Sequence, residues 1–167
     1  MCKYIFERVK FNKENFDLIQ EVYRLHMDQR RKLFDLACGI STDEDIMDYV
    51  EDKIRNDLTI VAIDKDNNNK VCGCFILEDG KAFDKIIVRA NLHAIICRAY
   101  WGKTSRDITN QFFSYLKSNY PLIKRLEARV PSQAFGVVKI LKDVGFKLEG
   151  TLKDSLIFLN KNKEYKF

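Results

Sequence analysis

One histidine of this chain stands where it could move a proton. His93 lies in the run Leu92–Ala99, whose β-forming residues predict a strand. An imidazole, with an ordinary pKa of about 6.5, can accept or release a proton near neutral pH. Tyr100 follows the run with a hydroxyl that could protonate a leaving group. Because no partner is visible beside His93, a hydrogen-bonded residue of the sheet is the alternative interpretation.

A short basic turn after this run could bind an anion. It precedes a predicted helix, and the first amides of a helix lack intrahelical partners and attract phosphate groups. Gly102 would let the backbone approach such a group closely. The turn also carries cationic and hydroxyl side chains: Lys103, Thr104, Ser105 and Arg106. Thr104 predicts the helix N-cap, and Asp107 in the first turn would repel a phosphate.

The remaining histidine and the cysteines predict no metal site. His26 lies on an amphipathic helical stretch and is expected to be a helix-face residue. Five scattered cysteines without a C-x-x-C pair favour reduced, mostly buried thiols in a cytoplasmic protein. Cys72 and Cys74 flank one glycine at strand spacing, so both are expected on one face. We expect neither a secretory leader nor a membrane span.

Length and composition predict one domain over residues 1–167. With 46% hydrophobic residues and only 2 Pro and 7 Gly, the chain can bury one core and is short for two. Its 29 basic and 24 acidic residues are mixed along the sequence and give a formal charge of +5. This charge suits an anionic ligand. Without a recognisable reading motif, it counts against a nucleic-acid-binding module.

Apolar spacing predicts alternating groups of helices and strands. Strands are expected at Tyr4–Val9, Thr59–Asp64, Val71–Leu77, Leu92–Ala99, Ile123–Val130 and Lys147–Leu159. Helices are expected at 16–39, after Ser41 and Thr42, at 104–119, and from Pro131 and Ser132 to Val144. Turns are expected at Asp79-Gly80 and at Asn160–Lys163, the latter leading into Tyr165–Phe167, while residues 81–90 have no clear pattern. The order predicts an α+β fold, a mixed sheet layered by helices.

The closing third of the chain resembles a known architecture. A strand, Arg125–Val130, leads into a helix, Ala134–Val144, which ends in Gly145-Phe146 and is followed by Glu149-Gly150-Thr151. Earlier, Tyr100–Lys103 stands where a phosphate-binding motif would begin. These features resemble the GNAT superfamily of acyl-CoA N-acyltransferases, particularly its branch similar to ribosomal-protein N-terminal acetyltransferases and to degenerate phage-encoded members. The motifs cover roughly residues 92–155, and the earlier part agrees in element order.

The resemblance implies a fold, a cofactor and a reaction. The fold would have a mixed, mostly antiparallel central sheet flanked by helices on both faces. The cofactor would be acetyl-CoA, and the reaction acetyl transfer to an amine, either a small molecule or a protein N-terminus, by direct attack. A wedge between two diverging strands would open at Trp101. His93 would be the base and Tyr100 the acid, and the cofactor would contact Cys97, Arg98, Ala99, Gly102, Lys103, Thr104, Ser105 and Arg106.

The chain departs from the family pattern at two places. The family's phosphate loop begins with Arg or Gln and contains two further small residues, but the corresponding positions here are Trp101, Thr104 and Arg106. The late helix of the family often carries Asn, Ser and Tyr, where this chain has Ala134, Val137 and Leu141. A leucine cannot deliver a proton, so the family's acid is missing from its usual position.

Three functions therefore remain open at this stage, the least favoured being the nucleic-acid-binding module. The first is an acyl-CoA-dependent N-acyltransferase. The second is a catalytically degenerate protein of the same fold that acts in a bacteriophage virion, in its assembly or in another protein interaction, where Trp101, Phe112, Phe113 and Tyr115 would serve packing or an interface. The first implies the cytoplasm and the second the host cytoplasm or the virion. A homo-oligomer is compatible with both.

Overall fold

The computed structural model describes residues 3–29, 42–78, 89–131, 134–152 and 155–160, with side chains described through residue 150. Its strands are β1 (Tyr4–Val9), β2 (Leu58–Asp64), β3 (Lys70–Glu78), β4 (Arg89–Ile96), β5 (Arg125–Pro131), β6 (Phe146–Leu152) and β7 (Ser155–Asn160). Its helices are α1 (Phe16–Gln29), α3 (Asp43–Asn56), α4 (Lys103–Asn119) and α5 (Phe135–Asp143), with short 3₁₀ turns η1 (Lys13–Asn15) and η4 (Arg98–Tyr100).

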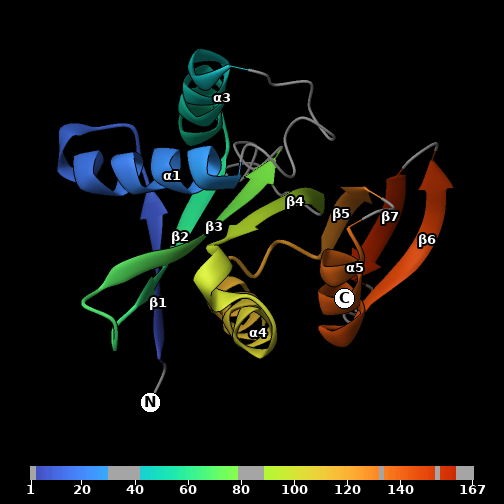
Figure 1. Ribbon diagram of the computed structural model, residues 1–167. Helices are drawn as coiled ribbons and strands as arrows, with labels where there is room; N and C mark the ends of the chain where they lie inside the picture. Colours follow the sequence, from blue (N-terminus) through green and yellow to red (C-terminus); the bar gives the residue numbers. More distant parts are fainter. Residues whose placement is uncertain (1–2, 30–41, 79–88, 132–133, 153–154, 161–167) are drawn as a thin grey trace.

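The strands form one mixed sheet between two helical layers. The seven strands lie in the order β1-β2-β3-β4-β5-β7-β6. Every neighbouring pair is antiparallel except β4 and β5, which are parallel. Helices α1 and α3 cover one face of the sheet, and α4 and α5 lie on the other (Figure 1). This confirms the expected α+β fold with a mostly antiparallel central sheet and helices on both faces.

Two apolar clusters hold these layers to the sheet. Strand residues alternate between the faces, so neighbouring positions enter different clusters. On the α4 side, Phe75 of β3 stacks on Phe112 of α4, with ring centroids 3.8 Å apart and an interplanar angle of 11°. On the α1 and α3 side, Val22 and Val50 are completely buried against the sheet. No helix in the described ranges is both long and apolar enough to cross a membrane.

The starts of two helices show which capping predictions succeed. Thr42 and Asp45 form a reciprocal capping box at α3, with both bonds 3.0 Å long, and the helix begins after Ser41 and Thr42 as predicted. The predicted cap of α4 at Thr104 is wrong. Gly102 is its N-cap residue, with φ of 84°, and α4 begins at Lys103. The positive φ of Gly102 turns the chain into the helix earlier than the hydroxyl pattern indicated.

A β-bulge in β3 corrects the prediction that Cys72 and Cys74 share a face. The register pairs Ala62 with Gly73 and then Ile63 with Val71, so Cys72 is an extra residue on β3. Alternation is reset at that point. Cys72 therefore packs in the cluster under α4, whereas Cys74 packs in the cluster under α1 and α3.

The predicted final strand, Lys147–Leu159, is two strands. β6 ends at Leu152, and β7 begins at Ser155 and inserts between β5 and β6. The polar residues Lys153-Asp154-Ser155 between the apolar residues of the two strands are the sequence signal for this boundary. Several predictions lie outside the described residues: the first helix beyond residue 29, the turn at Asp79-Gly80, Ser132, and the last turn and strand beyond residue 160.

Replacing Phe112 with Ala should destabilise the fold by about 3 to 5 kcal/mol, because it removes a fully buried ring and leaves a cavity. The matched control is Phe135→Ala, since Phe135 is 79% exposed and its loss should change the free energy of unfolding by less than about 0.5 kcal/mol. Urea unfolding followed by circular dichroism measures both. Equal losses for the two variants would contradict this packing.

Candidate functional site

The parallel strands β4 and β5 separate soon after they meet. Their register has three pairs, Arg89 with Arg125, Ala90 with Leu126, and Asn91 with Glu127. β4 continues to Ile96, while β5 continues along β7 on its other edge. The two ribbons diverge beyond the paired segment (Figure 1). The predicted divergence of the two strands, here called the wedge, is confirmed.

A buried carboxylate marks the last pair before the strands part. The side chain of Glu127 is only 5% exposed. Arg89 of β4 donates to its Oε2 over 2.6 Å, and Nε of Arg125 lies 3.3 Å from its Oε1. A buried charge requires such partners, and here one of them comes from each strand. Glu127 thereby ties β4 to β5 at the closed end of the wedge.

The backbone of β4 determines which amides face the wedge. The Cys97 amide donates to the Cys72 carbonyl over 2.8 Å, so it is used by the bond to β3. In an antiparallel pair the backbone groups of successive residues point to opposite edges of the strand. The amides of Ala94 and Ile96 therefore point towards β5, beyond the last paired residue. Among the predicted cofactor residues Cys97–Ala99, the Cys97 amide is therefore not available to a ligand.

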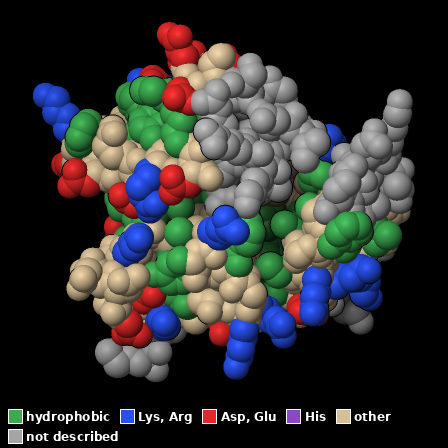
Figure 2. All heavy atoms as spheres, viewed as in Figure 1, with side chains coloured by type: hydrophobic (Ala, Val, Ile, Leu, Met, Phe, Trp, Pro, Cys, Tyr) green, Lys and Arg blue, Asp and Glu red, His purple; other side chains and the backbone are tan. Residues whose placement is uncertain are grey.

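A small exposed residue marks the opening of the wedge towards α4 and α5. Ala94 lies in the fourth of seven strands, where burial is the rule, yet its side chain is exposed. Ala90 and Leu92, four and two residues earlier on β4, are buried in the cluster under α4. Because alternate residues of a strand share a face, Ala94 points to that same side. Figure 2 shows hydrophobic side chains in the gap between α4 and α5, flanked by Lys and Arg groups.

The turn from β4 to α4 brings together most of the predicted cofactor residues. Gly102 precedes the helix, and the residues from Lys103 to Arg106 form the first turn of this 17-residue helix. A Cβ atom added to Gly102 would meet nothing within 4 Å, so the space beside the first amides is open. Ser105 donates its hydroxyl hydrogen to the Gly102 carbonyl over 2.8 Å. The geometry is that of a helix N-terminus able to receive an anion.

Two charged residues of this first turn point in different directions. Arg106 is paired with Asp143 of α5 over 3.3 Å, which links the two helices beside the gap. Its Nε is buried without a hydrogen-bond partner among the described residues. Asp107 lines a cavity of about 340 Å³ together with Lys3 and Tyr4, on the β1 side of α4. The expected repulsion between Asp107 and a phosphate is therefore directed away from the gap.

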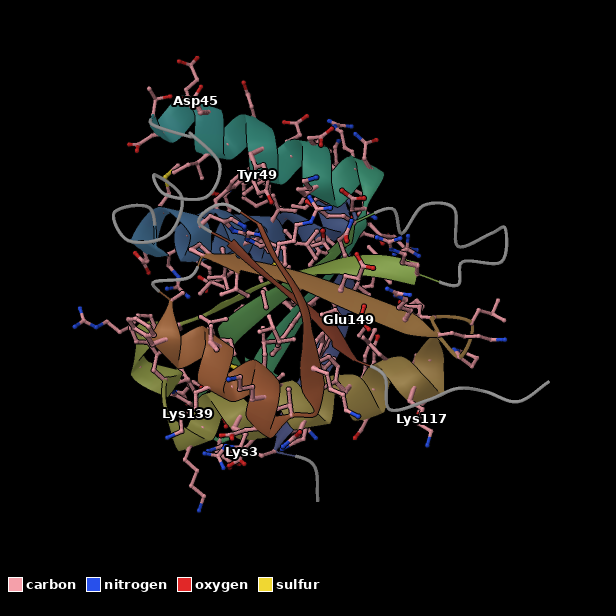
Figure 3. All side chains as sticks on the ribbon, turned by 90° about the vertical axis from the view of Figure 1, so that its right-hand side faces the viewer. Lys3, Asp45, Tyr49, Lys117, Lys139 and Glu149 are labelled. Atoms are coloured by element: carbon pink, nitrogen blue, oxygen red, sulfur yellow. The ribbon has the colours of Figure 1, made fainter. Side chains whose placement is uncertain are left out.

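His93 lies on the opposite face of the sheet, under α1 and α3. Its ring stacks on that of His26 with centroids 6.3 Å apart, and the Tyr49 ring is 6.1 Å away. Tyr49 projects from α3 towards α1 (Figure 3). His26 is completely buried, and its Nδ1 must carry a hydrogen because it bonds the Val22 carbonyl over 2.8 Å. His26 is thus an inner-face residue of α1 that touches the predicted base.

Burial controls the protonation of both histidines. It lowers the pKa of His93 to about 4, and the nearby Lys53 cation contributes in the same direction. It also lowers the pKa of His26 to about 4, although the bond to the Val22 carbonyl opposes this shift. Both imidazoles are therefore neutral at pH 7, a state in which His93 can accept a proton.

Tyr100 is placed away from the wedge. Its ring is buried, and its hydroxyl accepts a hydrogen bond of 2.8 Å from Asn67, in the turn between β2 and β3. Burial raises its pKa, as does the neighbouring Asp64. β5 lies on the other side of β4 from this turn. This position favours a structural role for the hydroxyl, and Leu141, at the family's acid position, is buried in the core.

Sequence reasoning missed three residues of the site. Nothing in the sequence indicated Ala94, because the exposure of its side chain depends on where β5 stops pairing with β4. Glu127 did give a sequence signal, because a carboxylate inside the apolar run from Leu126 to Val130 needs a specific partner. Arg129, also in that run, is exposed on the face opposite its buried neighbours.

Acidification should destabilise the protein through these two histidines. Because their folded pKa values of about 4 lie below the ordinary 6.5, the unfolded chain binds more protons between those pH values. The free energy of unfolding should fall as the pH falls through this window, by up to about 1.4 kcal/mol per pH unit for each histidine. Urea unfolding at about pH 7 and about pH 5 measures the loss, which should be smaller in His26→Gln. An equal loss in both proteins would show that His26 titrates normally.

Comparison with known proteins places this geometry in a structural class. No family model and no curated protein matches the sequence. A ribosomal-protein-S5-alanine acetyltransferase from Vibrio fischeri matches with a TM-score of 0.69 at 17% identity, over 99% of this chain and 97% of its own. A GNAT-family acetyltransferase from Bacillus anthracis gives 0.67 at 10% identity, over 95% of this chain and 94% of its own.

A spermidine N-acetyltransferase variant from Vibrio cholerae gives a TM-score of 0.66 at 13% identity, over 94% of this chain and 92% of its own. Identities this low carry information about the fold alone. Together with the diverging strands β4 and β5, they show that this chain has the GNAT acetyltransferase fold that its closing segment predicted.

Proposed function

We propose that this chain is an N-acyltransferase that transfers an acetyl group from acetyl-CoA to an amine by direct attack. The observation that carries the proposal is the wedge between β4 and β5, which stops pairing after Asn91 and Glu127. It lies between two different environments. One face has the gap between α4 and α5 with a helix N-terminus, and the other has a neutral imidazole.

The residues on the α4 side fit a long anionic thioester. The first amides of α4 and the open space beside Gly102 would receive the pyrophosphate, as helix N-termini do in general. Arg106, which is paired with Asp143 of α5, would add a cation beside the same group. Ala94 leaves room for the narrow pantetheine arm, and its amide points towards the thioester carbonyl. The thioester supplies an activated acyl group.

The residues on the other face fit the acceptor. His93 is neutral at pH 7 and lies on the wedge strand, so it can hold the proton released when the amine nitrogen bonds to the carbonyl carbon. With its lowered pKa, His93 is too weak a base to deprotonate a free alkylammonium ion efficiently. It is suited to the proton of an attacking nitrogen, which becomes acidic as the carbon–nitrogen bond forms. The carbon–sulfur bond then breaks, and water protonates the thiolate.

The compared proteins are consistent with an amine acceptor. One is named for the alanine of a ribosomal protein and another for spermidine. A protein N-terminus and a small amine therefore both stay within the proposed substrate range. The absence of the family's tyrosine acid from the position of Leu141 does not prevent this route, because water can protonate the thiolate.

Isothermal titration calorimetry with acetyl-CoA tests the proposed cofactor site. We expect saturable binding in the micromolar range, and a loss of at least about tenfold in affinity for Ala94→Phe, because the ring would fill the gap that the pantetheine arm needs. The matched control is Ser118→Phe, an exposed position near the far end of α4. Absence of binding at millimolar acetyl-CoA would refute the proposal and favour a degenerate protein. Equal binding by both variants would place the cofactor elsewhere.

The proposed base has its own test. His93→Gln should lower turnover by about 10²- to 10⁴-fold, the usual contribution of a general base, and leave acetyl-CoA affinity unchanged. Release of free CoA thiol measures turnover. His26→Gln is the control, because it removes the imidazole that stacks on His93 and so separates a loss of packing from the loss of the base. Equal turnover in His93→Gln and the parent protein would make His93 a structural residue.

A further inference from the structure

The face of the sheet that carries His93 bears an ordered set of charges. The register places Glu78 of β3 beside Asn91 of β4, and Asn91 beside Glu127 of β5. The alternation puts all three on the α1 and α3 side, because Leu77, Ala90 and Leu126 belong to the cluster on the other face. This row crosses the closed end of the wedge.

The carboxylates on this part of the face are already neutralised. Glu78 pairs with Lys53 of α3 over 3.0 Å. Glu127 is held by Arg89 and Arg125. Arg125 also reaches Glu149 of β6, with Nη2 3.5 Å from its Oε2. None of these acidic groups is left as an unpaired charge that would attract a cationic ligand.

The next row of residues, at the open part of the wedge, carries a positive charge where the first row carries carboxylates. One step of alternation beyond Asn91 on β4 is His93, and one step beyond Glu127 on β5 is Arg129. The two therefore lie on the same face of the sheet, one on each of the two strands that border the wedge. Each is two residues past the last register pair of β4 and β5. Arg129 is exposed, and its guanidinium has no ion pair among the described residues. In the described part of these two strands, the charge without an ion pair on the proposed acceptor side is thus a cation.

We infer that the acceptor is an amine that also carries an anionic group, a carboxylate or a phosphate, which Arg129 binds across the wedge from His93. The inference rests on the proposed function and narrows its substrate class. A guanidinium offers two parallel donors that match carboxylate and phosphate oxygens. Bound there, the anion would leave the amine free to reach the thioester. A polycation would meet Arg129, Lys53 and paired carboxylates, so spermidine-like acceptors are disfavoured.

A matched series of amines tests the inference with the acetyl-CoA-saturated protein. The probes are γ-aminobutyrate, its uncharged amide, aminopropyl phosphate and spermidine, with release of CoA thiol as turnover and calorimetry as binding. We expect kcat/KM to be at least about tenfold higher for the carboxylate or the phosphate than for the amide, with spermidine lowest. Comparison of γ-aminobutyrate with aminopropyl phosphate shows whether the site prefers a carboxylate or a phosphate.

Arg129→Gln should remove that preference by raising KM for the anionic amine about tenfold, with kcat and acetyl-CoA affinity little changed. Lys117→Gln is the charge-matched control, because Lys117 is exposed on α4, on the other side of the sheet (Figure 3). An equal response to all four amines, including no response, would overturn the inference, as would a preference for spermidine or an unchanged preference in Arg129→Gln. If acetyl-CoA itself fails to bind, it is the proposed function that fails.

Discussion

The structure depends on where two parallel strands stop pairing. β4 and β5 share three register pairs, and a buried carboxylate, Glu127, is clamped there by one arginine from each strand. Beyond that point β5 follows β7 and β4 follows β3. Each strand keeps a full partner on its outer edge, so the sheet loses few ladder bonds when its centre opens. The result is a gap bordered on both sides by backbone N–H and C=O groups. Such groups are costly to bury without hydrogen-bond partners.

The two faces of this gap differ in chemistry. On one face, Gly102 and the first turn of α4 offer amides and open space to an anion. On the other, His93 is neutral because it is packed against His26 and Tyr49. In the proposed acyltransferase, the two substrates would approach from opposite sides and meet at β4 without competing for the same surface. This arrangement requires no covalent intermediate on the protein.

Some local features were predicted from neighbouring residues, whereas features that depend on pairing between distant strands were not. Thr42 and Asp45 are three residues apart, so their capping box was visible in the sequence. The bulge at Cys72 was not visible in the sequence, because it arises from pairing between β2 and β3. The facing positions of His93 and Arg129 depend on a register between strands more than thirty residues apart. The cap of α4 was misplaced because the φ of Gly102 outweighed the preference of Thr104 for capping.

Amide hydrogen exchange, read residue by residue, tests the central claim most directly. In the free protein the Ala94 amide should exchange much faster than the Ile95 amide, because Ile95 is paired with Cys74 of β3 whereas Ala94 lies beyond the β4–β5 register. Acetyl-CoA should slow exchange at Ala94 and leave Ile95 nearly unchanged. Protection of Ala94 equal to that of Ile95 in the free protein, or bound acetyl-CoA that leaves Ala94 unaffected, would contradict the account.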